Sequence, residues 1–454
     1  MNQSMLLPRF SWLKRLGSQR SCQGGLITSV FGLLLLSGCA NSASVSAGGK
    51  TAADAPKEAP RAAGAAMPTG MGMPTPEKGA PAAEMTAAAK ESYGRGWQAF
   101  YMGDLAAARD EFRTAAKRDP KAGAAIFAAG VMMERMGDVA GAQKEYQAAF
   151  AAQPEFDTAM CAYASSLTAQ GRVADAENFL TDRRKKLPNS ARLLACHGEL
   201  KSLSKDSAGC QSLAQEALRI DPEFTAAMVV IARDHYRGHR VELARYALQA
   251  ILDGFGSETP ARDKGNGEAL LLRGLIEREQ GRRGLAMVSF EGAKAARPDM
   301  VEALINLGVM KLEAGNASDA IPVLSAATRY APANAVAHLN LGDAFRLTGK
   351  TDDAKREFEK ALALDSSLSM AHYDMGLLYL FSPTLPGLSE ASQADLAVKE
   401  LETFKSMRGP KALPGTVDDV DELLNRGKAK QAEIRNRAAA ASGAGDAAGT
   451  GEKK

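Results

Sequence analysis

The sequence predicts an all-α protein, a right-handed α-solenoid of about nine helical hairpins between a disordered N-terminal tether and a disordered C-terminal tail. Three sets of residues recur at a spacing of 34 positions, which an eight-residue insertion shifts once between the fifth and sixth repeats, and they carry this prediction. The first is proline, at Pro120, Pro154, Pro188, Pro222, Pro298 and Pro332. The second is glycine, at Gly96, Gly130, Gly198, Gly274, Gly308, Gly342 and Gly376. The third is a small residue, at Ala108, Ala142, Ala176, Cys210, Ala286, Ala320 and Ala354.

This pattern is typical of two helices that pack closely against each other. Small residues at two fixed places let the helix backbones approach, and aromatic residues such as Phe112 and Phe290 fill the remaining contact positions. A glycine followed by an aspartate, as at Gly103-Asp104, ends the first helix and begins the second. The recurring proline starts a helix or ends the preceding one.

The spacing resembles the tetratricopeptide repeat over residues 89–408. Repeats 1–5 are predicted over 89–258, an insertion over 259–266, and repeats 6–9 over 267–408. A second insertion is expected near 381–395, followed by the last helix of the ninth repeat from Leu396 to Met407. A capping helix is expected within 409–440, beginning at Thr416, and a disordered tail over 441–454.

Residues 1–38 have the features of a secretory leader. Four basic and no acidic residues precede the apolar run Leu26–Leu36, which is too short to span a bilayer. The run ends in Leu36-Ser37-Gly38-Cys39, which resembles the lipobox of bacterial lipoproteins. The resemblance implies cleavage before Cys39 and lipid attachment to its sulfur, and Met5 is an alternative translation start. Residues 39–88 then form the lipidated cysteine and a flexible Ala/Gly/Pro linker.

The charge of the chain argues against nucleic-acid binding. The full sequence has a formal net charge of +3, with 56 Lys+Arg against 53 Asp+Glu. Removing the four basic residues of the leader leaves 52 against 53, a net charge of −1. A protein dedicated to nucleic acid normally shows a basic excess, so the sequence predicts no nucleic-acid partner.

A row of polar residues is the best candidate for a peptide-binding groove. Asn306, Asn340 and Asp374 recur once per repeat, at the sixth position of three consecutive first helices. Amide side chains aligned in this way can hydrogen-bond an extended peptide backbone, as an asparagine ladder does in some members of the family. The alternative is that these residues only support the local turn of their own helix. The lysine clamp of other members is absent at Leu339, Asp343 and Val309.

The histidines do not predict a metal or a catalytic site. His338 and His372 also stand one repeat apart, where a repeated packing role is expected. His235 and His239 form H-x-x-x-H, with Tyr236 where a zinc protease needs glutamate and Gly238 favouring a helix end. Since nucleophile-elbow and phosphate-loop motifs are also missing, the sequence predicts a protein that is not an enzyme and uses no cofactor.

Three cysteines of the processed chain fall at interior repeat positions. Cys161, Cys196 and Cys210 are interpreted as buried free thiols, with a Cys196–Cys210 disulfide in an oxidising compartment as the alternative.

These features together predict a periplasmic scaffold anchored by lipid to the outer membrane. Ala40, rather than aspartate, follows Cys39, which favours transfer to the outer membrane under the common sorting rule. Other envelope proteins are the expected partners, bound through the concave groove and the last-repeat insertion. Nine repeats and a long tether resemble the outer-membrane lipoprotein of the myxobacterial gliding-motility machinery. Alternatives are an assembly factor for a type IV pilus or secretin, and a regulatory subunit of a cell-envelope polysaccharide or peptidoglycan enzyme.

Overall fold

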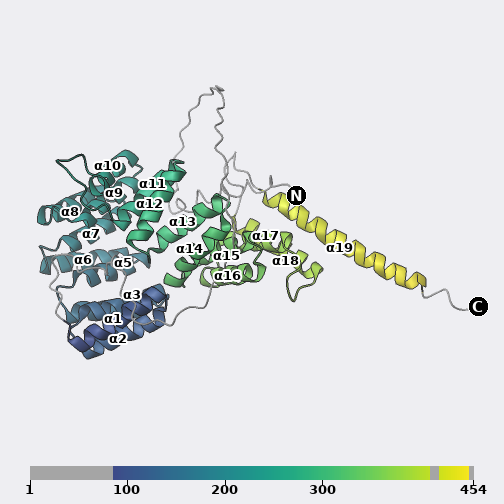
Figure 1. The fold of residues 1–454 in the computed structure, drawn as a ribbon, viewed down its shortest axis with the longest axis horizontal. Helices are drawn as coiled ribbons and strands as arrows, with labels where there is room; N and C mark the ends of the chain where they lie inside the picture. Colours follow the sequence, from purple (N-terminus) through teal and green to yellow (C-terminus); the bar gives the residue numbers. More distant parts are fainter. Residues whose placement is uncertain (1–84, 409–418, 449–454) are drawn as a thin grey trace, which may run out of the picture. The chain divides into compact units, whose positions relative to one another are not determined.

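The protein is an array of helical hairpins, and every regular element of its described part is a helix (Figure 1). The computed structural model describes residues 85–408 and 419–448. The predicted leader, Cys39 and nearly all of the predicted linker lie outside the described residues. Nine consecutive helix pairs are present, followed by one further helix, and the predicted fold class is therefore confirmed.

The first helices of the nine pairs follow the repeat register of the sequence. Eight of them begin at the residues where the register places them, and the first begins two residues before Ala89, at Ala87. The hydroxyl of Thr86 accepts a hydrogen bond from the amide of Ala89 and so caps that helix. The nine helices are α1 (Ala87–Met102), α3 (Gly123–Arg135), α5 (Asp157–Ala169), α7 (Ala191–Leu203), α9 (Thr225–Arg237), α11 (Gly267–Glu279), α13 (Val301–Glu313), α15 (Ala335–Leu347) and α17 (Ser369–Phe381).

The second helices begin after a short turn. Gly103 ends α1 with a φ of +83°, a left-handed conformation that glycine adopts without strain. The carboxylate of Asp104 then accepts a hydrogen bond of 2.9 Å from the amide of Ala107 and starts the next helix. The nine helices are α2 (Leu105–Arg118), α4 (Val139–Ala152), α6 (Val173–Lys186), α8 (Ser207–Ile220), α10 (Val241–Leu252), α12 (Arg283–Ala296), α14 (Ala317–Tyr330), α16 (Thr351–Leu364) and α18 (Glu390–Arg408).

Recurring glycines let the two helices of a pair approach closely. Phe112 and Phe290 are fully buried, each beneath the glycine that the sequence pattern pairs with it. A Cβ atom added at Gly96 would lie 2.5 Å from the Phe112 ring, and one added at Gly274 would lie 2.5 Å from the Phe290 ring. Such distances are shorter than van der Waals contact, so the ring occupies the space that a side chain would need.

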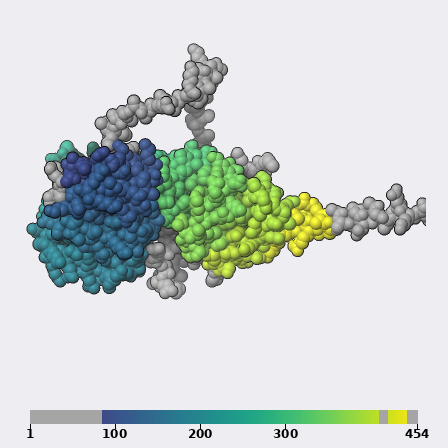
Figure 2. Space-filling view, turned by 90° about the horizontal axis from the view of Figure 1, so that it is seen from below, coloured from purple at the N-terminus to yellow at the C-terminus, as the bar shows by residue number. Residues whose placement is uncertain are grey.

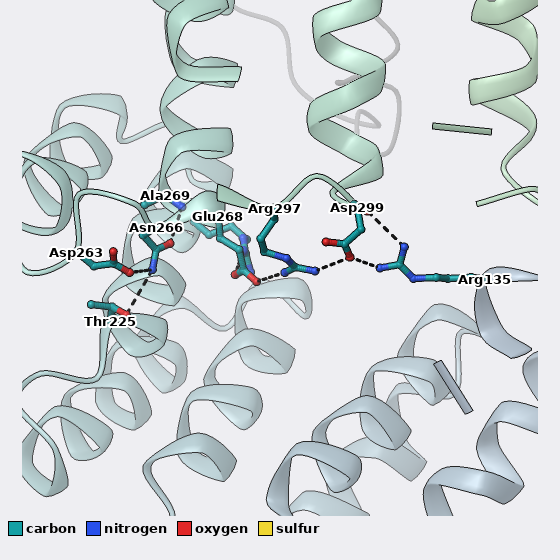
Figure 3. Close-up of polar contacts among 9 residues, drawn as sticks. Arg135, Thr225, Asp263, Asn266, Glu268, Ala269, Arg297 and Asp299 are labelled. Carbon is teal, nitrogen blue, oxygen red and sulfur yellow. Dashed lines mark hydrogen bonds and ion pairs between the residues drawn. The ribbon is translucent and has the colours of Figure 1, made fainter. Parts of the chain in front are cut away.

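The chain between α10 and α11 departs from the repeat register over residues 253–266. Gly254 and Pro260 form an isolated antiparallel bridge in this loop. At its end, the side chain of Asn266 caps α11 by accepting a hydrogen bond of 3.0 Å from the amide of Ala269. The same side chain donates hydrogen bonds to Asp263 (3.1 Å) and Thr225 (3.4 Å), as Figure 3 shows. The insertion therefore closes back onto its neighbours at the start of the sixth pair.

The insertion in the ninth pair is shorter than predicted. Helix α18 begins at Glu390, six residues before the expected Leu396, and the loop covers only 382–389. The buried side chain of Gln393, in the first turn of α18, holds the loop 382–389 by hydrogen bonds, which accounts for the early start of the helix. Its amide donates to the carbonyl of Tyr379 (3.0 Å) and accepts from the amide of Leu385 (2.7 Å).

Helix α19 (Val420–Ala448) covers the last pair. Its first two turns bury Val420, Leu423 and Leu424 in an apolar cluster with α17 and α18. The predicted capping-box residue Thr416 lies outside the described residues. The helix continues eight residues beyond the expected end at 440, so the prediction of a disordered tail from residue 441 is wrong as far as Ala448. None of the described helices has both the length and the apolar composition needed to cross a membrane.

The cysteine pairing differs from both interpretations of the sequence. Cys161 on α5 and Cys196 on α7 form a disulfide with a Cα–Cα distance of 5.8 Å, and Cys210 is free and buried. The prediction of three free thiols and the alternative Cys196–Cys210 pair are thus both wrong. The reason lies on α7, where Gly198 faces Cys210 of α8. Cys196 precedes Gly198 by two residues, about 200° around the helix, and so faces the neighbouring pair instead.

Candidate interaction surface

The first helices of successive pairs gather on one side of the array. α5, α7, α9 and α11 contact one another in sequence, and so do α13, α15 and α17. Repeat arrays bind partners along the face lined by equivalent helices. The surface that the first helices share is therefore the natural place for an extended partner, and its polar residues are the candidates for contact.

The predicted groove residues are only partly at the surface. Asn306 on α13 is half-buried, accepts a hydrogen bond of 2.6 Å from Arg278 and donates one of 2.7 Å to the carbonyl of Glu302. Asn340 on α15 is 5% exposed, and its amide donates to the carbonyl of Val336 at 2.8 Å. Asp374 on α17 is 6% exposed. Both asparagine amides bind a carbonyl one turn earlier in their own helix, so a peptide-binding role for the three residues stays a prediction.

A row of arginines and carboxylates crosses several pairs, and the sequence pattern gave no indication of it. Glu268 on α11 lies between Arg233 of α9 (3.1 Å) and Arg297 (3.8 Å). Arg297 in turn contacts Asp299 at 3.3 Å, and Asp299 contacts Arg135 of α3 at 2.6 Å. Figure 3 shows Glu268, Arg297, Asp299 and Arg135 in line. This arginine–carboxylate row links the fifth, sixth and seventh pairs to the second.

Asp299 stays ionised within this row. Burial alone raises the pKa of its carboxyl group, but the adjacent guanidinium groups of Arg297 and Arg135 outweigh that effect and hold the pKa below its usual value. The carboxylate is therefore a fixed negative charge between two fixed positive charges at neutral pH.

Two of the histidines form side-chain pairs within their own hairpins. His338 pairs with Glu357 (2.5 Å) and His372 with Glu400 (2.6 Å), each across the two helices of one hairpin. His239 has a φ of +56° after α9 has ended, so H-x-x-x-H does not lie on one helix. Among the described residues, no group of three or more His, Cys, Asp or Glu side chains is arranged to hold a metal ion.

The free cysteine is poorly suited to covalent chemistry. Cys210 is fully buried on α8. Burial raises the pKa of its thiol to about 12. The thiolate form, which is the nucleophile, is thus scarce at neutral pH.

His197 on α7 is a buried histidine whose two ring nitrogens have different partners. Arg184 donates toward Nδ1 at 3.3 Å, so this nitrogen is an acceptor and the ring is neutral, with Nε2 donating to Glu177 at 3.1 Å. Burial lowers the pKa of His197 below its usual value, and the neighbouring Glu177 opposes this only in part. Protonating the ring would place a second donor hydrogen against Arg184.

We expect His197 to make folding sensitive to mild acid. Its folded pKa is below the unfolded value of about 6.5, so the unfolded chain binds more protons and stability is lost as the pH falls below about 6.5. The free energy of unfolding, measured in urea at pH 7.5 and 5.5, should fall less in His197→Asn than in the wild type. His239→Asn is the matched control, because His239 is exposed. An equal loss on acidification in wild type and His197→Asn would contradict this role.

The chain is similar to known repeat proteins in sequence. Models described as tetratricopeptide repeat match residues 93–142, 134–183 and 311–373. No curated protein matches the sequence of the chain.

Several solved structures are similar over a large share of the chain. One is the APC/C hetero-tetramer Cut9–Hcn1, with 15% identity over 75% of this chain and 76% of that chain and a TM-score of 0.47. A tetratricopeptide repeat protein from Parabacteroides merdae has 15% identity over 64% of this chain and 99% of that chain, with a TM-score of 0.28. PilF from Pseudomonas aeruginosa has 20% identity over 48% of this chain and 95% of that chain, with a TM-score of 0.31.

Proposed function

We propose that this protein is a lipid-anchored periplasmic scaffold that holds other envelope proteins. The proposal starts from the array of helical hairpins and from its match to tetratricopeptide-repeat models. The fold suits protein–protein interaction, because stacked repeats offer a long surface of equivalent helices. The partners are extended or helical protein segments bound without covalent chemistry, and the protein acts without a cofactor.

The disulfide is the observation that carries the periplasmic assignment. Cys161 and Cys196 are joined across two repeats, and such structural disulfides persist in oxidising compartments and are rare in a reducing cytosol. The sequence Leu36-Ser37-Gly38-Cys39 after a basic and apolar leader also supports export to the periplasm, and it supports a lipid attached to Cys39. Two independent features therefore support one compartment.

The outer membrane and gliding motility are the finer parts of the proposal. Ala40 after Cys39 supports outer-membrane sorting, and the nine repeats behind a long tether support a component of an envelope-spanning gliding complex. Crosslinking in intact cells, followed by identification of the linked proteins, tests the pathway. Recovery of motility-complex proteins supports it, whereas exclusive recovery of a polysaccharide synthase or a peptidoglycan hydrolase would assign the scaffold to that enzyme.

Replacing the lipid acceptor tests the anchor. Cys39→Ser should move the protein from the membrane fraction to the soluble periplasmic fraction, because a serine oxygen cannot take the place of the acylated thiol. Cys22→Ser is the matched control, since Cys22 lies in the same leader and precedes the predicted cleavage point. Immunoblots of fractionated cells measure the distribution. Membrane retention of Cys39→Ser at the level of Cys22→Ser would refute the lipid anchor.

A further inference from the structure

Some helix pairs contact pairs that are far from them in the sequence. The first two pairs also contact the seventh and eighth pairs, and one apolar cluster contains residues of both groups together with residues of the sixth pair. In Figure 2 the blue surface of the first pairs borders the green surface of the later pairs. We call this contact the closure. From the early pairs the cluster takes Phe100, Leu105, Ala108, Phe112, Ala128, Ala129 and Met132. From the later pairs it takes Ala286, Phe290, Val301, Leu304, Leu307, Met310, Val323, Ala327, Tyr330 and Ala337.

Arg135 is the centre of the polar half of the closure. Its guanidinium forms an ion pair with Asp299 at 2.6 Å and donates to the carbonyls of Asp299 and Tyr330, both at 3.3 Å. The same group lies over the ring of Phe100, 5.1 Å from the centroid. The Arg135 and Asp299 side chains are only 19% and 18% exposed, so the pair is weakly screened by solvent.

Several contacts between the two sides lie at or near helix ends. The rings of Phe100 and Tyr330 lie 5.4 Å apart. Gly137, in the turn after α3, lies so close to Ala333 that an added Cβ would be 3.1 Å from the alanine methyl. Beside these contacts is an open pocket of about 520 Å³, lined by residues that include Met102, Met136 and Arg329.

The closure is built differently from the rest of the array. Successive helices pack against each other along their lengths, as α1 and α2 do. The contacts of Arg135, Phe100 and Gly137 across the closure instead join the ends of α1, α3 and α14 with the loops before α13 and α15. An open pocket lies beside it and is lined by residues of both sides. The two sides can therefore separate without the loss of any helix or of any contact within a hairpin.

We propose that the closure is a reversible latch that joins the first two pairs to the seventh and eighth. Arg135 holds the latch shut through Asp299 and Tyr330. When it opens, the apolar residues of the closure that face the opposite side become exposed. The latch goes beyond the scaffold role, which requires no moving part.

Charge reversal at Arg135 tests the latch. In the full chain, Arg135→Glu places a negative charge against Asp299 and should open the closure. Hydrogen exchange measured by mass spectrometry should then accelerate at the closure, at residues 97–103, 133–138 and 328–333. The acceleration should be at least roughly tenfold, because an unpaired buried charge costs more than the pair contributes. The dye ANS should bind more strongly to the exposed apolar residues.

Two further variants separate opening from general damage. Arg135→Glu combined with Asp299→Arg restores opposite charges and should restore slow exchange. Arg113→Glu is the matched control, because the ion pair of 2.7 Å between Arg113 and Glu145 joins α2 to α4 and so lies within one side of the closure. The latch is overturned if Arg135→Glu leaves exchange at 328–333 unchanged. It is also overturned if exchange rises equally in α5–α10, or if Arg113→Glu opens 328–333 as much.

Discussion

Removing the Cys161–Cys196 disulfide, by replacing both residues with serine, is expected to lower the free energy of unfolding by about 2–4 kcal/mol. The two cysteines are 35 residues apart in the sequence, and their bond ties the third pair to the fourth, so its loss frees the unfolded chain and loosens one junction of the array. Both side chains are half-buried, so serine fits each position without opening a large cavity. Urea unfolding followed by circular dichroism measures the change.

Reduction provides the control for this effect. Wild-type protein in dithiothreitol should unfold at the same urea concentration as the double serine variant, and dithiothreitol should leave the variant unchanged. A thiol count adds a direct check. Unfolded, unreduced protein that lacks residues 1–39 should contain one reactive thiol, that of Cys210. A count of three would show that the disulfide is absent.

Phe290→Ala is expected to have the largest effect on stability, a loss of about 3–5 kcal/mol. The ring is fully buried on α12 and packs against Gly274 of α11, which has no side chain that could fill the cavity left by its removal. Hydrogen exchange should accelerate first in α11, α12 and α13, since each pair is held mainly by its neighbours.

Val288→Ala is the matched control for the loss of Phe290. Val288 lies on the same helix but is 67% exposed, so its truncation should change the free energy of unfolding by no more than about 0.5 kcal/mol. Similar losses in the two variants would show that the ring does not hold the hairpin together.

The hairpins could be predicted because their determinants recur locally. Gly274 and Phe290 lie on the two helices of one hairpin, and the same sequence spacing links Gly96 to Phe112 and Gly342 to Phe358. A ring packed against a glycine is a contact within one hairpin, so it produces the same residue spacing in every repeat that has it. The first residues of the helices could be predicted for the same reason.

Features that join different repeats were harder to predict. Cys161 and Cys196 are 35 residues apart, one repeat plus one residue, and this spacing was a usable signal for a bond between successive first helices. The alternative disulfide between Cys196 and Cys210 does not form, because Gly198, and not Cys196, faces α8. The closure has no such signal, because Arg135 and Asp299 meet only after the small rotations of several repeats accumulate.

The candidate groove residues show the same limit. They recur once per repeat, yet Asn340 and Asp374 are buried while Asn306 is not. Asp374 lies on α17, which α18, the loop 382–389 and α19 enclose, whereas Asn340 is buried on α15 without that cover. A repeat register predicts which residues are equivalent, but the packing around each repeat decides which of them a partner can reach.

Helix α19 has a consequence for self-association. A repeat stack that ends in an open apolar face presents a surface onto which the first repeat of another molecule could add, and head-to-tail contacts of this kind grow into filaments. Val420, Leu423 and Leu424 cover that face in the ninth pair, and α19 then continues with a polar surface. At this end α19 covers the face onto which another molecule would add, which disfavours head-to-tail growth from the ninth pair.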